Sequence, residues 1–178
     1  FSGKMNADKG LVSKGISLPQ MIEQLDAAGI ERAFLIAARS GRPGLPGCYH
    51  MPYELVARAV AKYPKRFHGL AGIDPYTGMK GVRELEHAVK NLGFIGAHFY
   101  PHWFELAPDH AKVYPFYTKC CELGIPFCTQ IGHTGPLCPS EPGRPIPYLD
   151  DVLLEFPDLV VVGGHVGYPW IDEVISLA

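Results

Sequence analysis

Five short apolar runs recur along this chain at nearly even distances, and this repeat limits its fold more than any other feature. The runs begin 34, 27, 32 and 33 residues apart and cover residues 33–37, 67–73, 94–99, 126–131 and 159–163. One strand, one helix and two loops take about 30 residues, so this is the spacing of βαβ units. Runs without a polar face are typical of strands that are covered on both sides. The sequence therefore predicts an α/β fold with a parallel sheet.

The segments between the runs carry the 3.6-residue period of amphipathic helices. The first has apolar residues at Leu18, Ile22 and Leu25, a serine suited to the N-cap at Ser17, and Gly29 just past its end. The same period predicts helices over residues 82–92 and 113–123, weaker ones over 52–63 and 148–156, and another that begins at residue 169. Each predicted strand is therefore followed by a predicted helix.

Two architectures place helices around a parallel sheet, the doubly wound sheet and the closed barrel. No G-x-G-x-x-G or G-x-x-x-x-G-K-[ST] motif follows any of the runs, which removes the main support for a nucleotide-binding doubly wound sheet. We therefore expect a TIM-type (β/α)8 barrel. A complete barrel takes ~250 residues. Residues 1–178 are thus expected to form a single partial (β/α) barrel domain, truncated at both ends.

Charge and hydropathy exclude several classes of partner. The 16 basic and 18 acidic residues are mixed along the chain, so no basic stripe is present to bind nucleic acid. The apolar stretches fall far short of the ~20 residues that cross a membrane, and no charged-then-apolar leader opens the chain. The five cysteines are odd in number and form no C-x-x-C pair, as is typical of a reducing compartment. We expect a soluble, cytoplasmic protein.

Polar side chains follow the predicted strands at the point where each strand ends. In a parallel barrel these carboxyl ends form the active site. The residues found there are Arg39, Asp74, His98, His102, Gln130, His133 and His165. Histidines that converge from separate strands indicate metal-assisted acid/base chemistry, although a single one is more often a hydrogen-bonded structural residue. An Asx turn explains Asp74 better than catalysis does.

A proline-rich segment, residues 134–147, follows the fourth run and is expected to cover the site. It holds five prolines and one cation, Arg144. Loops of this length in compact domains are usually functional, and a guanidinium suits a substrate carboxylate through a bidentate pair. The other interpretation is a surface loop that proline stiffens.

Several motifs resemble one known family. They are GAHFYPH at 96–102, LGIPF at 123–127, GHTG at 132–135, YLDDV at 148–152 and FPDLVVVGGHVGYPW at 156–170. Together they look like the amidohydrolase-related family of metal-dependent enzymes, which includes aminocarboxymuconate-semialdehyde decarboxylase and γ-resorcylate decarboxylase. The resemblance extends from about residue 15 to residue 178, and the last motif is its most specific part.

The resemblance implies an eight-stranded barrel with one divalent metal, usually zinc. The family's ligands are an H-x-H pair after strand 1, a histidine after strand 5 and an aspartate after strand 8. With the five runs as about strands 2 to 6, His165 matches the histidine after strand 6, so it is the predicted catalytic residue. The strand-5 ligand belongs to a Pro-x-x-x-His pattern, where this chain has Gln130 after Pro126 and then His133. Both are candidate metal ligands, and His133 is favoured.

The sequence therefore predicts a metal-dependent decarboxylase or hydrolase that acts on a small carboxylated substrate. The candidate substrate-binding residues are Arg144, Arg39, His98 and His102. We expect one divalent metal, Zn²⁺ by resemblance, in the intact protein, weak or absent metal binding in this segment, and a homodimer. The alternative is a non-catalytic or metal-free barrel homologue that acts as a ligand-binding or oligomeric subunit, which Gln130 at a ligand position would suit.

Overall fold

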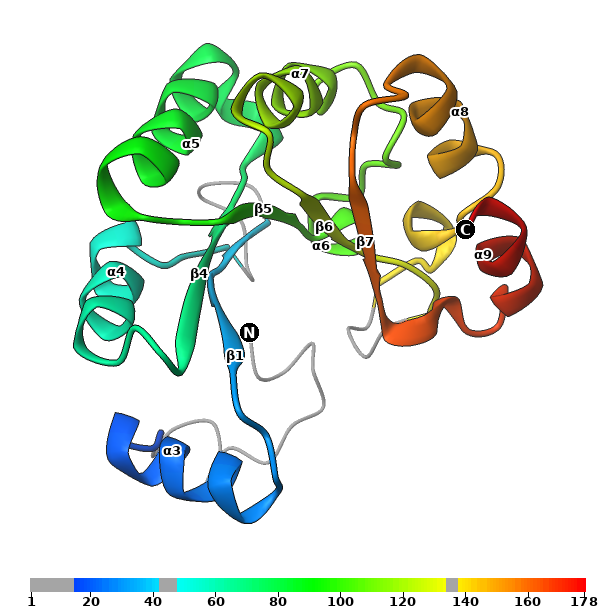
Figure 1. Ribbon diagram of the computed structural model, residues 1–178. Helices are drawn as coiled ribbons and strands as arrows, with labels where there is room; N and C mark the ends of the chain where they lie inside the picture. Colours follow the sequence, from blue (N-terminus) through cyan, green and yellow to red (C-terminus); the bar gives the residue numbers. More distant parts are fainter. Residues whose placement is uncertain (1–14, 42–47, 134–137) are drawn as a thin grey trace.

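The protein, described by a computed structural model over residues 15–41, 48–133 and 138–178, is built on one parallel sheet. The strands lie in the order β1-β4-β5-β6-β7, and every neighbouring pair is parallel (Figure 1). Their bounds are β1 Ala33–Ala37, β4 Phe67–Gly72, β5 Gly96–Phe99, β6 Phe127–Gln130 and β7 Val161–Gly164. Five strands in chain order with helical crossovers form part of a TIM-type barrel, which confirms the predicted fold class.

The helices α4, α5, α7 and α8 lie along the outer side of this sheet, and α3 lies apart from them beyond the start of β1 (Figure 1). The longer ones are α3 Leu18–Ala27, α4 Tyr53–Lys62, α5 Met79–Leu92, α7 Tyr114–Leu123, α8 Tyr148–Glu155 and α9 Ile171–Leu177. The short ones are η1 Pro75–Thr77, α6 Pro101–Phe104, η2 Glu141–Gly143 and η3 His165–Gly167. The helix predicted from residue 169 begins later, because Trp170 N–H first closes a turn onto Gly167 O at 2.7 Å. Among the described helices, none is long and apolar enough to cross a membrane.

The sequence signals that predicted helix ends are present in the structure. The Ser17 hydroxyl accepts a hydrogen bond from Gln20 N–H, and the Gln20 side chain accepts one from Ser17 N–H, so the two residues form a capping box. Gly93 and Gly124 end α5 and α7 with φ of 72° and 61°, where glycine avoids the strain of a side chain. The third strand begins at Gly96 rather than residue 94, because Phe94 N–H still closes α5.

Side chains alternate between two faces of the sheet, and the two faces differ. The outer face carries Ala97, Phe99 and Phe127, which are buried in the main core. Residues of the opposite parity point to the inner face, where Phe34 and Val162 are 58% and 46% exposed. In a barrel this inner face becomes the interior. Polar side chains with inner parity near the strand ends are therefore the ones placed to meet a small molecule.

A small antiparallel pair, β2 Arg39–Ser40 and β3 Tyr49–His50, follows β1 directly. Its strands are two residues long, so no alternation of polar and apolar residues announces them in the sequence. The pairing sets Arg39 opposite His50. This pair therefore brings two polar residues together near the carboxyl end of the sheet.

The substitution Gly72→Ala tests the close approach of β1 to the end of β4. A methyl group there would press against Ala37 O and lie 2.8 Å from Arg39 N, so the β1–β4 pairing would have to shift. We expect the free energy of unfolding to fall by about 2 kcal/mol or more, the scale of overpacking in a core. Gly164→Ala is the control, because its methyl group meets only Thr129 O at 3.5 Å. Urea denaturation compares the two variants, and equal stabilities would contradict the prediction.

Candidate functional site

Three neighbouring strands bring polar residues to the same edge of the sheet. His98 lies in β5, Gln130 ends β6, and His165 directly follows β7. The parallel register pairs His98 with Cys128 and Gln130 with Gly164, so the three strands end in step. His98 and Gln130 share the parity of the inner face. The structure thus gathers three of the predicted site residues at the carboxyl edge of the sheet.

His98 is a buried imidazole with an unsatisfied nitrogen. Only 7% of its surface is exposed, and its ring centroid lies 4.2 Å from that of Tyr100. Its Nδ1 has no hydrogen-bond partner among the described residues. Burial, and to a lesser extent the charge of His165, lowers the pKa of His98 to about 4. His98 is therefore neutral at pH 7, and its buried nitrogen is suited to bind a polar group of a ligand or a water molecule.

His165 lies open to solvent beside this buried group. It begins η3, and both His165 and Val166 have left-handed backbone angles, with φ of 70° and 61°. Such angles cost non-glycine residues about 1–3 kcal/mol each and gather at functional sites. Burial is the main cause that lowers the pKa of His98 and of His102, and the charge of His165 lowers both as well, so His165 interacts electrostatically with each of these two imidazoles. His165 is therefore the solvent-exposed member of this group of three histidines.

His102 lies beneath the segment that contains η2. Its Nε2 is 2.9 Å from Gly132 O, and a carbonyl oxygen only accepts, so Nε2 carries the proton. Its Nδ1 is then a bare acceptor, which lacks a partner within the described part of the chain. Burial is the main cause that lowers the pKa of His102. A methyl group at Gly143 would collide with the His102 ring, so the ring packs directly under η2.

The two candidate metal ligands differ in their surroundings. Gln130 Oε1 is buried without a hydrogen bond from any described residue. His133 is exposed, and its Nδ1 lies 2.6 Å from Ser140 Oγ. Within residues 15–41, 48–133 and 138–178, no group of three or more His, Cys, Asp or Glu side chains could hold a metal ion. The ligand roles of Gln130 and His133 stay predictions.

Each predicted substrate-binding arginine already has a carboxylate partner. Arg144 binds Glu173, with Nη2 at 2.9 Å and Nε at 3.3 Å from Oε1, although 41% of its side chain is exposed. Arg39 pairs with Glu84 at 2.6 Å and lies over the Tyr53 ring at 4.2 Å from its centroid. Its parity follows the outer residues of β1, which explains why it points toward α4 and α5. Their roles in substrate binding stay predictions.

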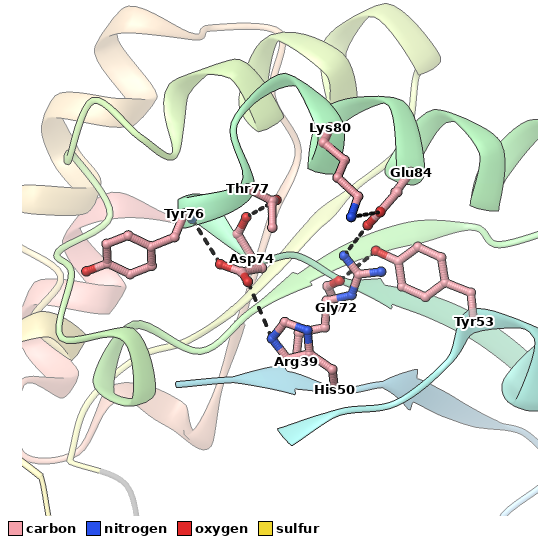
Figure 2. Close-up of polar contacts among 9 residues, drawn as sticks. All are labelled: Arg39, His50, Tyr53, Gly72, Asp74, Tyr76, Thr77, Lys80 and Glu84. Carbon is pink, nitrogen blue, oxygen red and sulfur yellow. Dashed lines mark hydrogen bonds and ion pairs between the residues drawn. The ribbon is translucent and has the colours of Figure 1, made fainter. Parts of the chain in front are cut away.

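Sequence reasoning missed a contact between His50 and Asp74 (Figure 2). The predicted Asx turn is present, because Tyr76 N–H donates to Asp74 Oδ1 at 2.9 Å. The second oxygen, Oδ2, lies 3.4 Å from His50 Nε2. The sequence assigned no role to His50, His68, His87 or His110. The two-residue strand that carries His50 leaves no pattern that could have announced the contact.

Comparison with known proteins gives a family match and two curated relatives. The family model described as amidohydrolase matches residues 23–178. The γ-resorcylate decarboxylase of Polaromonas sp. (strain JS666) is 36% identical over 80 residues, which cover 42% of this chain and 24% of that protein. The 2-keto-4-carboxy-3-hexenedioate hydratase of Sphingobium sp. (strain SYK-6) is 33% identical over 86 residues, or 44% of this chain and 25% of that protein. The matched segment thus spans about a quarter of each relative.

Solved structures match a larger part of the chain. A TIM-barrel protein of Bordetella bronchiseptica, uncharacterised in function, has a TM-score of 0.77 and 28% identity, over 91% of this chain and 56% of that one. A dihydroxybenzoic acid decarboxylase of Polaromonas sp. JS666, bound to manganese and the inhibitor 2-nitroresorcinol, has a TM-score of 0.57 and 25% identity, over 85% of this chain and 55% of that one. The chain spans about half the length of these barrels.

The low pKa of His98 predicts a stability that depends on pH. The folded pKa of about 4 lies below the ordinary 6.5, so protonation favours the unfolded chain. The stabilising contribution is complete above pH 6.5 and is lost as the pH falls toward 4. Between pH 7 and pH 5 we expect His98 to account for a loss of about 2 kcal/mol in the free energy of unfolding.

Urea denaturation at the two pH values measures this loss in the wild type and in His98→Asn. The variant should lack most of the His98 contribution, because asparagine does not titrate. His87→Asn is the control, since His87 is exposed on α5 and should leave the dependence unchanged. The same pH dependence in His98→Asn as in the wild type would contradict the assignment.

Proposed function

The chain belongs to the amidohydrolase family, and on this premise we propose that the protein is a metal-dependent lyase that decarboxylates a small carboxylated, aromatic-derived substrate. The observation that carries the proposal is the group of His98, His102 and His165 at the carboxyl edge of the sheet. Active sites of parallel barrels form at this edge. The decarboxylases among its relatives favour this reaction over simple hydrolysis.

Decarboxylation needs a proton at the carbon that loses CO₂. The C–C bond breaks, CO₂ leaves, and the electron pair that stays on carbon takes up a proton. We assign this transfer to His165, which is open to solvent and can regain its proton from water. His98 beside it is neutral at pH 7 and therefore adds no positive charge.

The substrate would lie against the inner face, between the buried nitrogens and the segment over them. We propose that His98 Nδ1 and His102 Nδ1 bind polar atoms of the substrate, because both nitrogens are buried without a partner among the described residues. Arg144 is the better placed of the two arginines to hold a carboxylate, since its side chain is 41% exposed while that of Arg39 is only 12% exposed. To bind the substrate carboxylate, Arg144 would have to break its ion pair with Glu173.

One divalent metal is the proposed cofactor of the intact protein. Manganese in the related dihydroxybenzoic acid decarboxylase supports a divalent cation, and Zn²⁺ is the competing choice from the sequence. The described residues fit a divalent metal incompletely, because no three His, Cys, Asp or Glu side chains in the described ranges are grouped so that they could hold one. A catalytic site takes at least three protein ligands. We therefore assign no step of the reaction to the metal.

A hydratase is the second candidate function, favoured by the similarity to 2-keto-4-carboxy-3-hexenedioate hydratase. It would add water to a double bond, with the same histidines moving the proton. A ligand-binding or oligomeric subunit without catalysis is the remaining candidate, and Gln130 at a ligand position is its support. Release of CO₂ from a panel of hydroxylated benzoates separates decarboxylation from the other two. A homodimer and a cytoplasmic location also stay predictions.

In the intact protein, His165→Asn is expected to lower the rate of CO₂ release by ~10² or more, the scale of a lost general acid. His110→Asn is the control, because it removes a histidine outside the cluster. Circular dichroism confirms that both variants fold. Turnover within a few-fold of the wild type in His165→Asn would remove His165 from the proposed mechanism.

The 178-residue chain by itself should bind a divalent metal weakly or not at all. Two candidate ligands are fewer than the three that hold a catalytic zinc. Metal analysis after dialysis against Mn²⁺ and, separately, Zn²⁺ measures the bound amount. Near-stoichiometric metal that survives dialysis would show that other residues complete the site, and its identity would decide between the two cations.

A further inference from the structure

We propose that His50 and Asp74 form a second proton-transfer pair at the site, with His50 as a base that touches the substrate and Asp74 as its positioning residue. The proposal rests on the proposed function, and it concerns two residues that the sequence did not assign to catalysis. Figure 2 shows the pair at the end of β4, with the side chains that surround it.

Asp74 lies on the same side of the sheet as the histidine cluster. It follows β4 with the parity of Leu70 and Gly72, which is that of the inner face. The neighbouring strand places Gly72 opposite His98, and Ile73 N–H donates to His98 O at 2.9 Å. Asp74 thus follows directly after the residue that is bonded to His98. The pair therefore lies one strand away from His98, at the same carboxyl edge.

The Asp74 carboxylate is held in one orientation and is left with one free oxygen. Its side chain is 0% exposed. Oδ1 accepts the Tyr76 N–H, while Oδ2 has no hydrogen bond from the described residues and lies 3.4 Å from His50 Nε2. A buried carboxylate oxygen is costly without a donor. The imidazole N–H of His50 is the donor that the geometry offers, and a small shift of the ring would complete the bond.

The position of His50 is built by the short β2–β3 pair. Register pairs His50 with Arg39, and Met51 N–H donates to Ala38 O at 2.8 Å. Arg39 is fixed in turn by Glu84 at 2.6 Å and by the ring of Tyr53 (Figure 2). The short β2–β3 pair and the partly buried ion pair between Arg39 and Glu84 thus hold one imidazole near one carboxylate.

This arrangement prepares His50 to accept a proton. With Nε2–H directed at Asp74, the other ring nitrogen, Nδ1, carries the lone pair. The His50 side chain is 35% exposed, so a substrate can reach it. Burial is the main cause that lowers the pKa of His50; Asp74 and Glu84 raise it, and Arg39 lowers it. His50 is therefore neutral at pH 7 and available as a base.

The proposed step moves one proton and leaves the charges balanced. A substrate hydroxyl loses its proton to His50 Nδ1, so the O–H bond breaks and an N–H bond forms. The electron pair stays on the substrate oxygen, and the Asp74 carboxylate compensates the positive charge on the imidazolium. The proton returns by the same path when product leaves. His165 would then donate a proton to a carbon atom of the substrate, and His50 would accept one from an oxygen atom.

The experiment compares His50→Gln, Asp74→Asn and a matched control, His68→Gln. His68 lies on β4 with the same parity as Asp74 but at the opposite end of the strand, so it removes an inner-face histidine away from the site. In a CO₂-release assay of the intact protein, kcat should fall by ~10² in His50→Gln with KM nearly unchanged. Activity of the wild type should fall as His50 becomes protonated at low pH. His50→Gln should lack this acid limb, Asp74→Asn should move it to lower pH, and His68→Gln should keep it.

Nitrogen-15 NMR of the histidine side chains gives a readout that needs no substrate. His50 should be the Nε2–H tautomer in the wild type, and its pKa should fall in Asp74→Asn because the carboxylate no longer raises it. If Asp74→Asn does not fold, His50→Gln and the wild-type tautomer decide the question.

Three outcomes would overturn the proposal. A kcat within about twofold of the wild type in His50→Gln, with the acid limb unchanged, would make the pair purely structural. An Nδ1–H tautomer of His50 would exclude the pair itself. A wild-type protein that turns over no carboxylate would overturn the proposed function and the catalytic role with it, while the NMR result would still decide whether the pair exists.

Discussion

The in-step pairing of parallel strands is the constraint on which the rest of the structure depends. Because β4 to β7 run in one direction, their carboxyl ends meet at a single edge of the sheet. Residues that are far apart in the chain, Asp74, His98, Gln130 and His165, come to that edge without any direct attraction between them. The core of aliphatic and aromatic side chains on the outer face packs against the strands and fixes their positions. The site is thus a consequence of how the sheet packs.

Burial then gives the gathered polar groups different chemistry. His98 and His102 lie inside the protein, where the loss of water disfavours their charged forms and leaves one nitrogen of each without a partner in the described structure. His165 is exposed to solvent, and its backbone has a left-handed φ that is strained for a non-glycine residue. One residue type thus occurs here in two different surroundings, buried and solvent-exposed, and this difference is what the proposed proton transfer would use.

The positions of the two arginines, Arg39 and Arg144, likewise decide which groups they contact. Arg39 leaves β1 on the outer side, so its guanidinium meets Glu84 and Tyr53 between two helices instead of entering the inner face. From there it supports the hairpin that carries His50. Arg144 stays near the surface and is bound to Glu173. Both guanidinium groups are therefore bound to carboxylates of this chain.

The sequence by itself determined the α/β class, all five strands to within two residues at each end, and helix ends such as Ser17 and Gly93, because these depend on local periodicity and backbone conformation. It also identified the family and the strand ends where polar residues gather. Only the tertiary structure decided that His50 meets Asp74, that the two arginines are paired, and which histidines are buried. Those outcomes depend on contacts between distant segments and on the water that folding removes, and neither leaves a periodic trace along the chain.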